Sequence, residues 1–173
     1  MPVTITIDQR TFTPESPADE RHGGWRAADL VALADYLEAL AGTLELKHWN
    51  VNVDLDTVPE DCFAQIETIW AQTNAILQLT DGFLELDPEV QRATLVHELL
   101  HLHLNPVGEL SDETLRDAMS KPLVAMHGRV LWHALEQRVD LLSQVIAPSL
   151  PLPSFGVAAD VGTSTVTELR TGS

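Results

Sequence analysis

The chain is poor in cysteine and in basic residues. Its one cysteine, Cys62, cannot form a disulfide within the chain, which agrees with a reducing compartment. Only 10 Lys and Arg stand against 26 Asp and Glu, so the formal net charge is −16. A field of this sign repels phosphate backbones and anionic lipid headgroups, so neither nucleic acid nor a membrane surface is an expected partner.

Long apolar runs are also missing. No stretch reaches the roughly 20 apolar residues of a membrane span, and the opening MPVTITIDQR lacks the basic start and apolar centre of a signal peptide. We therefore expect a soluble, cytoplasmic protein. With 173 residues, of which 45% are hydrophobic, the chain is long enough for one domain with a core and too short for two.

The first half of the chain reads as strands around one helix. Val3, Ile5 and Ile7 alternate with polar residues, and turn residues soon follow, so residues 1–24 are expected to form an edge strand or a mobile arm. Apolar residues recur at helical spacing over residues 27–41, before Gly42. Further strands are predicted at residues 49–55, 63–70 and 74–79, the last two as a hairpin.

The second half is expected to be helical. Asp87-Pro88-Glu89 is a strong helix start, because Asp87 can cap free amide groups and Pro88 is preset for the first turn. This helix is predicted to reach Leu104 and to end at Asn105-Pro106 and Gly108. A short helical piece over 111–119, a last helix over 122–146 and a Pro-rich, extended or disordered tail over 147–173 follow.

On the last helix, one apolar stripe is interpreted as core: Leu123, Met126, Val130, Leu135, Leu141 and Leu142. The tail after it could dock to a protein partner. No internal repeat is visible.

The helix that starts at Pro88 contains the run His97-Glu98-Leu99-Leu100-His101. Four residues apart on a helix, His97 and His101 share one face and can bind one zinc ion. Glu98 lies beside them and can take a proton from water. Helical spacing places both imidazoles on the inward stripe, where they are costly unless paired or bound to metal, whereas His103 turns to another face.

A catalytic zinc ion usually takes three protein ligands, so a third ligand is needed. Leu104 and Val107 stand where a metzincin would have Gly and His, which excludes that subclass. The last predicted helix carries Glu136 and Asp140 on one face. Glu136 can reach the metal, and Asp140, one turn further, can accept the outer N–H of a zinc-bound histidine.

A helical HExxH motif followed by a helical ExxxD motif resembles the gluzincin metallopeptidases, the thermolysin-like zincins, and is similar to the ImmA/IrrE-type intracellular metallopeptidases. The resemblance implies an α+β, zincin-like fold over residues 25–146. A small antiparallel or mixed sheet would pack on the active-site helix, and a C-terminal helix would carry the third ligand. It further implies that His97, His101 and Glu136 bind one Zn²⁺ ion, that Glu98 is the general base and that Asp140 orients His97.

The implied activity is hydrolysis of peptide bonds in a peptide or protein substrate. An extended substrate would pair with an exposed strand edge, expected within residues 74–79. His133 and His127 are the histidines available to stabilise the oxyanion, and either could equally be a packed or surface residue. The alternative is a zincin-fold protein of weak or no activity that serves as a binding or structural component; the presence of Glu98 favours the enzyme.

Overall fold

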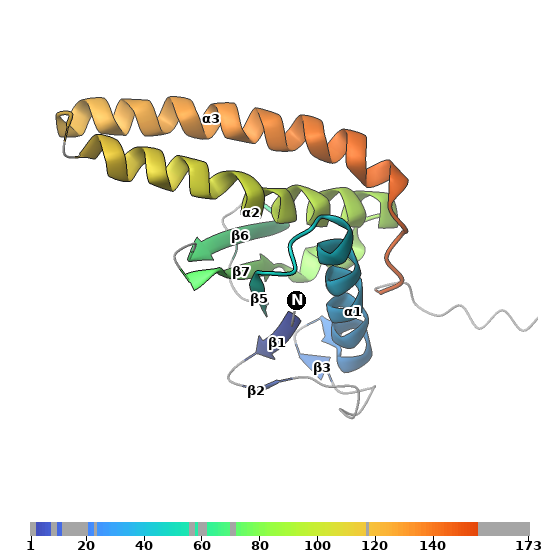
Figure 1. The fold of residues 1–173 in the computed structure, drawn as a ribbon. Helices are drawn as coiled ribbons and strands as arrows, with labels where there is room; N and C mark the ends of the chain where they lie inside the picture. Colours follow the sequence, from blue (N-terminus) through green and yellow to red (C-terminus); the bar gives the residue numbers. More distant parts are fainter. Residues whose placement is uncertain are drawn as a thin grey trace, which may run out of the picture.

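The computed structural model describes residues 3–7, 10–11, 21–22, 24–55, 58, 62–69, 72–116 and 118–155. These residues form an α+β fold in which a small mixed sheet packs with three helices (Figure 1). Most of the expected tail, residues 156–173, lies outside the described part of the chain.

The main sheet has five strands in the order β2-β1-β5-β7-β6. β1, β5 and β7 are parallel, whereas β2 and β6 are antiparallel to their neighbours. Their bounds are β1 Val3–Ile7, β2 Arg10–Thr11, β5 Asn50–Asp54, β6 Ala64–Ile69 and β7 Asn74–Leu79. A separate two-stranded sheet joins β3, Arg21–His22, to β4, Trp25–Arg26. The strand predicted near the N-terminus and the hairpin of β6 and β7 are both present.

The edge of the sheet differs from the prediction. β7, the expected edge, lies inside the sheet because β5 pairs with one side of it and β6 with the other. The edge strand on this side of the sheet is β6, which pairs with β7 alone among the described strands. β7, which precedes α2 in the sequence, is thus paired on both sides, whereas β6, the strand before it, has one unpaired edge.

Three helices accompany the sheet. Helix α1 spans Ala27–Thr43, α2 Pro88–Arg116 and α3 Lys121–Ile146, and a short 3₁₀ turn over Asp81–Glu85 precedes α2. Figure 1 shows α3 running along α2 on the side away from the sheet, with the far halves of both helices projecting beyond the strands. No helix in the described part of the chain is both long enough and apolar enough to span a membrane.

The predicted end of the motif helix at Leu104 is wrong, because α2 continues through Pro106 to Arg116. The residues expected to start a separate piece at 111 belong to the same helix. Pro106 removes one backbone hydrogen bond, a loss that the packing of α2 against α3 can offset. Gly108 serves this packing: a Cβ there would meet Leu135 Cδ1 at 3.3 Å, so the glycine lets α3 approach closely.

An aromatic cluster joins the segment that follows α3 to the core. The rings of Trp25, Phe83 and Phe155 lie 6.2–6.5 Å apart, and all three side chains are buried. Phe155 follows a 3₁₀ turn over Ala147–Ser149. Residues 147–155, expected to be part of an extended or disordered tail, are therefore packed onto the domain.

The apolar stripe predicted to be core on the last helix is wrong in all but one position. Leu135 is half-buried, whereas the remaining five residues are exposed: Leu123, Met126, Val130, Leu141 and Leu142. The physical reason is that α3 packs along α2 on one face only, so its opposite face has nothing described to pack against.

Candidate metal centre

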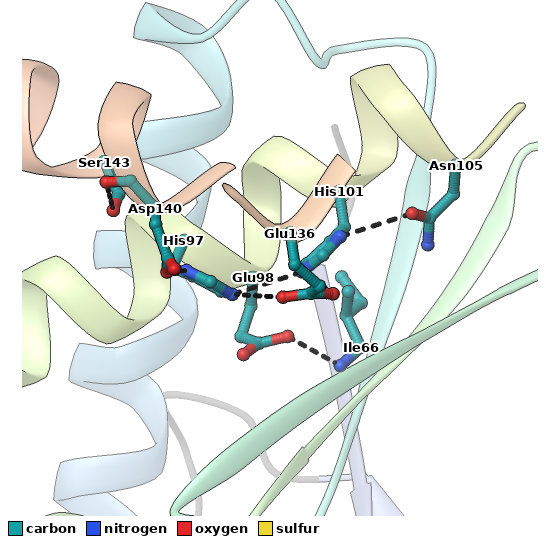
Figure 2. A network of polar contacts seen from close by, with 8 residues as sticks. All are labelled: Ile66, His97, Glu98, His101, Asn105, Glu136, Asp140 and Ser143. Atoms are coloured by element: carbon teal, nitrogen blue, oxygen red, sulfur yellow. Dashed lines mark hydrogen bonds and ion pairs between the residues drawn. The ribbon is translucent and has the colours of Figure 1, made fainter. Parts of the chain in front are cut away.

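The structure brings together the two histidines of α2 and the glutamate of α3 (Figure 2). The Nε2 atoms of His97 and His101 are 3.2 Å apart. Glu136 places Oε2 3.6 Å from Nε2 of His97 and Oε1 3.4 Å from Nε2 of His101. These three side chains form a group that could hold a metal ion.

The spacing of the donor atoms fits a single ion. Bonds of about 2.1 Å in tetrahedral directions place any two ligand atoms about 3.4 Å apart. The two Nε2 atoms, 3.2 Å apart, lie near this value, and each of them has a different oxygen of the Glu136 carboxylate 3.4–3.6 Å away. One ligand atom from each of the three side chains, those of His97, His101 and Glu136, lies within 4.8 Å of the other two.

Each histidine is oriented through its other ring nitrogen. Asp140 Oδ1 lies 3.2 Å from Nδ1 of His97, and Asn105 Oδ1 lies 3.2 Å from Nδ1 of His101. Because both oxygens are acceptors, the neutral rings carry their protons on Nδ1 and direct the lone pairs of Nε2 toward each other. Two lone pairs facing a carboxylate repel, and a bound cation removes this repulsion.

The electrostatics of the site favour metal-binding forms of the histidines. Burial lowers the pKa of His97, and the neighbouring His101 lowers it further, against the opposing effect of Glu136 and Asp140. Burial also lowers the pKa of His101. Both imidazoles are therefore neutral at pH 7. Burial raises the pKa of Glu136, while His97 acts in the opposite direction.

Glu98 lies beside this group and is buried. Its Oε2 accepts a hydrogen bond of 2.9 Å from the backbone N–H of Ile66 in β6, which fixes the carboxyl between α2 and the sheet edge (Figure 2). Burial raises the pKa of Glu98 to about 8, although the Ile66 N–H opposes the shift. Without a metal, the carboxyl is thus mostly protonated at pH 7.

A hollow of about 350 Å³ adjoins His97 and Glu98. It is of the size of a small ligand pocket. Its wall also includes Cys62, Phe63, Ala64, Ala93, Thr94 and Ser143. Cys62 is exposed and lies at this hollow, although nothing in its local sequence indicated a place near the histidines.

Two residues of the site were missed in the sequence. Asn105, interpreted as part of a helix end, accepts a hydrogen bond from Nδ1 of His101. Its position four residues after that histidine was the sequence signal that could have identified it. Trp132 stacks on the His101 ring with centroids 5.8 Å apart and planes 6° from parallel. Its place four residues before Glu136 puts it on the same side of α3.

The three other histidines of α2 and α3 lie outside the group of donor atoms. His133 is exposed and hydrogen-bonds Gln137 through Nε2, 3.2 Å away. His127 is half-buried on α3, nine residues and thus roughly 13 Å of helix before Glu136. His103 turns away as expected, with Nε2 2.7 Å from the carbonyl oxygen of Leu44. Neither His133 nor His127 is brought to the donor atoms by a contact among the described residues.

Comparison of the chain with protein-family models, with curated proteins and with solved structures finds no match. The chemistry of the site is therefore argued from its own geometry.

Proposed function

We propose that the protein is a zinc-dependent metallopeptidase with a zincin-like fold. The observation that carries the proposal is the group of two neutral imidazoles and a carboxylate whose ligand atoms lie within 4.8 Å of one another, with Glu98 beside them. Two nitrogen ligands and one oxygen ligand suit zinc, and three protein ligands leave a position open for chemistry.

Zinc bound here would lower the pKa of a water molecule toward about 7 and polarise a substrate carbonyl. The positive charge would also favour the ionised form of Glu98 and so lower its pKa from about 8. Glu98 would then accept a proton as the water oxygen adds to the carbonyl carbon. It would return this proton to the amine as the C–N bond breaks.

The free edge of β6 is the part of the sheet that a substrate could join. The Ile66 N–H points away from β7 to Glu98, so this edge runs directly past the general base. A peptide added as a strand would gain main-chain hydrogen bonds along β6 and place one carbonyl near the site. The hollow lined by Phe63 and Ala64 would accept one of its side chains.

The substitution Glu98→Gln tests this proposal. The variant should keep one zinc ion per chain, measured by elemental analysis, but cleave a proteome-derived peptide library about 10²–10⁴-fold more slowly. Glu89→Gln is the matched control, because Glu89 is an exposed glutamate on the same helix. Equal cleavage by both variants, or no stoichiometric zinc in the purified protein, would exclude the peptidase.

The second candidate is a zincin-fold protein that binds zinc without turnover. One observation favours it. Tyr36, the only tyrosine, lies on α1 and donates a hydrogen bond of 2.7 Å to the Pro151 carbonyl, so its hydroxyl is not available to stabilise an oxyanion. A stable zinc content with no cleavage by the unsubstituted chain, and no difference between it and Glu98→Gln, would support this candidate.

A further inference from the structure

A second hollow, of about 430 Å³, lies at the turn that joins α2 to α3. Three of the ten basic residues of the chain line this hollow, and no acidic residue does. Its lining residues are Arg116 of α2 and Lys121, Val124, Ala125, Gly128 and Arg129 of α3. The hollow therefore carries the opposite charge to the chain as a whole, whose net charge is −16.

The three cations of this basic hollow, Arg116, Lys121 and Arg129, are exposed and available to a ligand. None of them forms an ion pair with a carboxylate among the side chains that the structure describes. Helix α3 begins at Lys121, so the positive end of its dipole lies at the same place. An anionic group in the hollow would thus meet positive charge from both helices.

The rest of the wall suits an anion that is joined to an aliphatic chain. Val124 and Ala125 contribute apolar side chains, and Gly128 contributes only backbone. An inorganic anion would leave these apolar groups in water, whereas a glutamate side chain or the end of a peptide would cover them with its own carbon atoms. Arginine binds a carboxylate through two parallel hydrogen bonds. The ligand that fits is therefore a peptide that carries a carboxylate.

The basic hollow lies on the same flank of the two helices as the metal-binding group. Ala125 and Arg129 precede Glu136 by about three and two helical turns, so they share its face of α3. Arg116 follows Glu98 by about five helical turns, so it lies on the side of α2 that Glu98 presents to β6. One ligand can therefore contact both places without crossing to the outer face of α3.

The distance between the two places suits an extended peptide. Along α3, Arg129 lies roughly 10 Å and Lys121 roughly 22 Å before Glu136. An extended chain covers these distances in roughly three to seven residues. Figure 1 shows the arrow of β6 directed, like α2, toward the turn between α2 and α3. A peptide added along β6 would therefore run from the metal-binding group toward the basic hollow.

We propose that the basic hollow binds a carboxylate of the peptide substrate, from an acidic side chain or from the C-terminus, about three to seven residues from the cleaved bond. The spacing rests on the proposed peptidase function, whereas the binding of the carboxylate does not. The hollow gives acidic peptides a place to bind on a chain whose net charge otherwise repels them.

Peptide binding to the full chain with Glu98→Gln tests the carboxylate site without cleavage. Three fluorescein-labelled peptides are compared by anisotropy: one with two glutamates and an amidated end, its glutamine analogue with the same end, and that analogue with a free C-terminus. The first or the third should bind about fivefold more tightly than the second, the upper range for one exposed ion pair. Adding Arg129→Gln should remove the difference. Equal binding of all three peptides overturns the proposal.

Arg138→Gln is the matched control for the binding experiment. Arg138 is also an exposed arginine of α3, but it follows Arg129 by about two and a half turns and so lies on the opposite face. This variant should keep the preference for the carboxylate. If Arg138→Gln weakens binding as much as Arg129→Gln does, the basic hollow is not the site and only the general charge of the helix acts.

Cleavage of a peptide library by the unsubstituted chain tests the spacing. The cleaved peptides should be enriched in a carboxylate about three to seven residues from the cleaved bond, and Arg129→Gln, but not Arg138→Gln, should lose this enrichment. Cleavage without the enrichment refutes the proposed role of the hollow and leaves the peptidase standing. Binding that depends on Arg129 without any cleavage refutes the peptidase and retains the carboxylate site.

Discussion

Asp140 offers the sharpest test of how the site holds a metal. Its Oδ1 accepts from His97 Nδ1 at 3.2 Å, so it fixes the tautomer and the direction of the ring. Loss of such a partner typically weakens metal binding 10–100-fold. The Asp140 side chain is 58% exposed, and water screens its charge. We therefore expect Asp140→Ala to raise the zinc dissociation constant about tenfold, or about 1.4 kcal/mol.

The variant Asp140→Asn separates geometry from charge. Its amide oxygen still accepts from His97, and a neutral hydrogen bond retains about half the strength of a charge-assisted one. A loss of about threefold is expected. Both constants can be measured by competition with a chromophoric zinc chelator.

The control is Glu113→Ala, which removes an exposed acid from the far part of α2 and should leave zinc binding unchanged. If Asp140→Ala binds zinc as tightly as Glu113→Ala does, Asp140 does not position His97. If the asparagine variant is as weak as the alanine variant, the charge of Asp140, and not its hydrogen bond, carries the effect.

The remaining predictions concern the segment after α3. Phe155→Ala should lower the free energy of unfolding by about 3–5 kcal/mol and the melting temperature by about 6–20 °C, because the ring is buried in the aromatic cluster. Leu152→Ala, an exposed change nearby, should shift melting little; equal shifts would show that Phe155 is not packed. Burial raises the pKa of Tyr36 to about 12, above its unfolded value near 10. Its stabilising contribution is full below pH 10 and is lost as the pH rises toward 12. Tyr36→Phe should lose about 1 kcal/mol at pH 7 and show less alkaline destabilisation in denaturant titrations; the same pH dependence as the unsubstituted chain would contradict this role.

Much of the candidate site could be predicted because its signals are local. The four-residue spacing of His97 and His101 places them on one helix face wherever that helix packs. Glu136 and Asp140 follow the same rule on α3. What the spacing could not supply is the distance between the two helices, which depends on the packing of α2 against α3. Gly108 contributes to this packing, yet its residue type suggested a helix end.

Several residues around the site could be located only from contacts distant in sequence. Cys62 reaches the hollow because β6 is the edge strand next to α2, and Trp132 reaches His101 across the helix pair. Neither contact produces a periodic pattern in the sequence. Asn105 does follow His101 at the helical spacing of four residues, but Pro106 beside it indicated a helix end.

The sequence by itself determined the helical HExxH motif, the ExxxD pair, the start of α2 and the alternating strands, because backbone preferences and one-sided hydrophobicity act within a few residues. The tertiary structure alone decided that β6 is the free edge, that α2 continues past Pro106 and that Phe155 joins the core. It also decided that the apolar stripe of α3 faces outward. A periodic pattern shows that a helix has an apolar face, but only the packing of distant segments decides whether the same molecule covers that face.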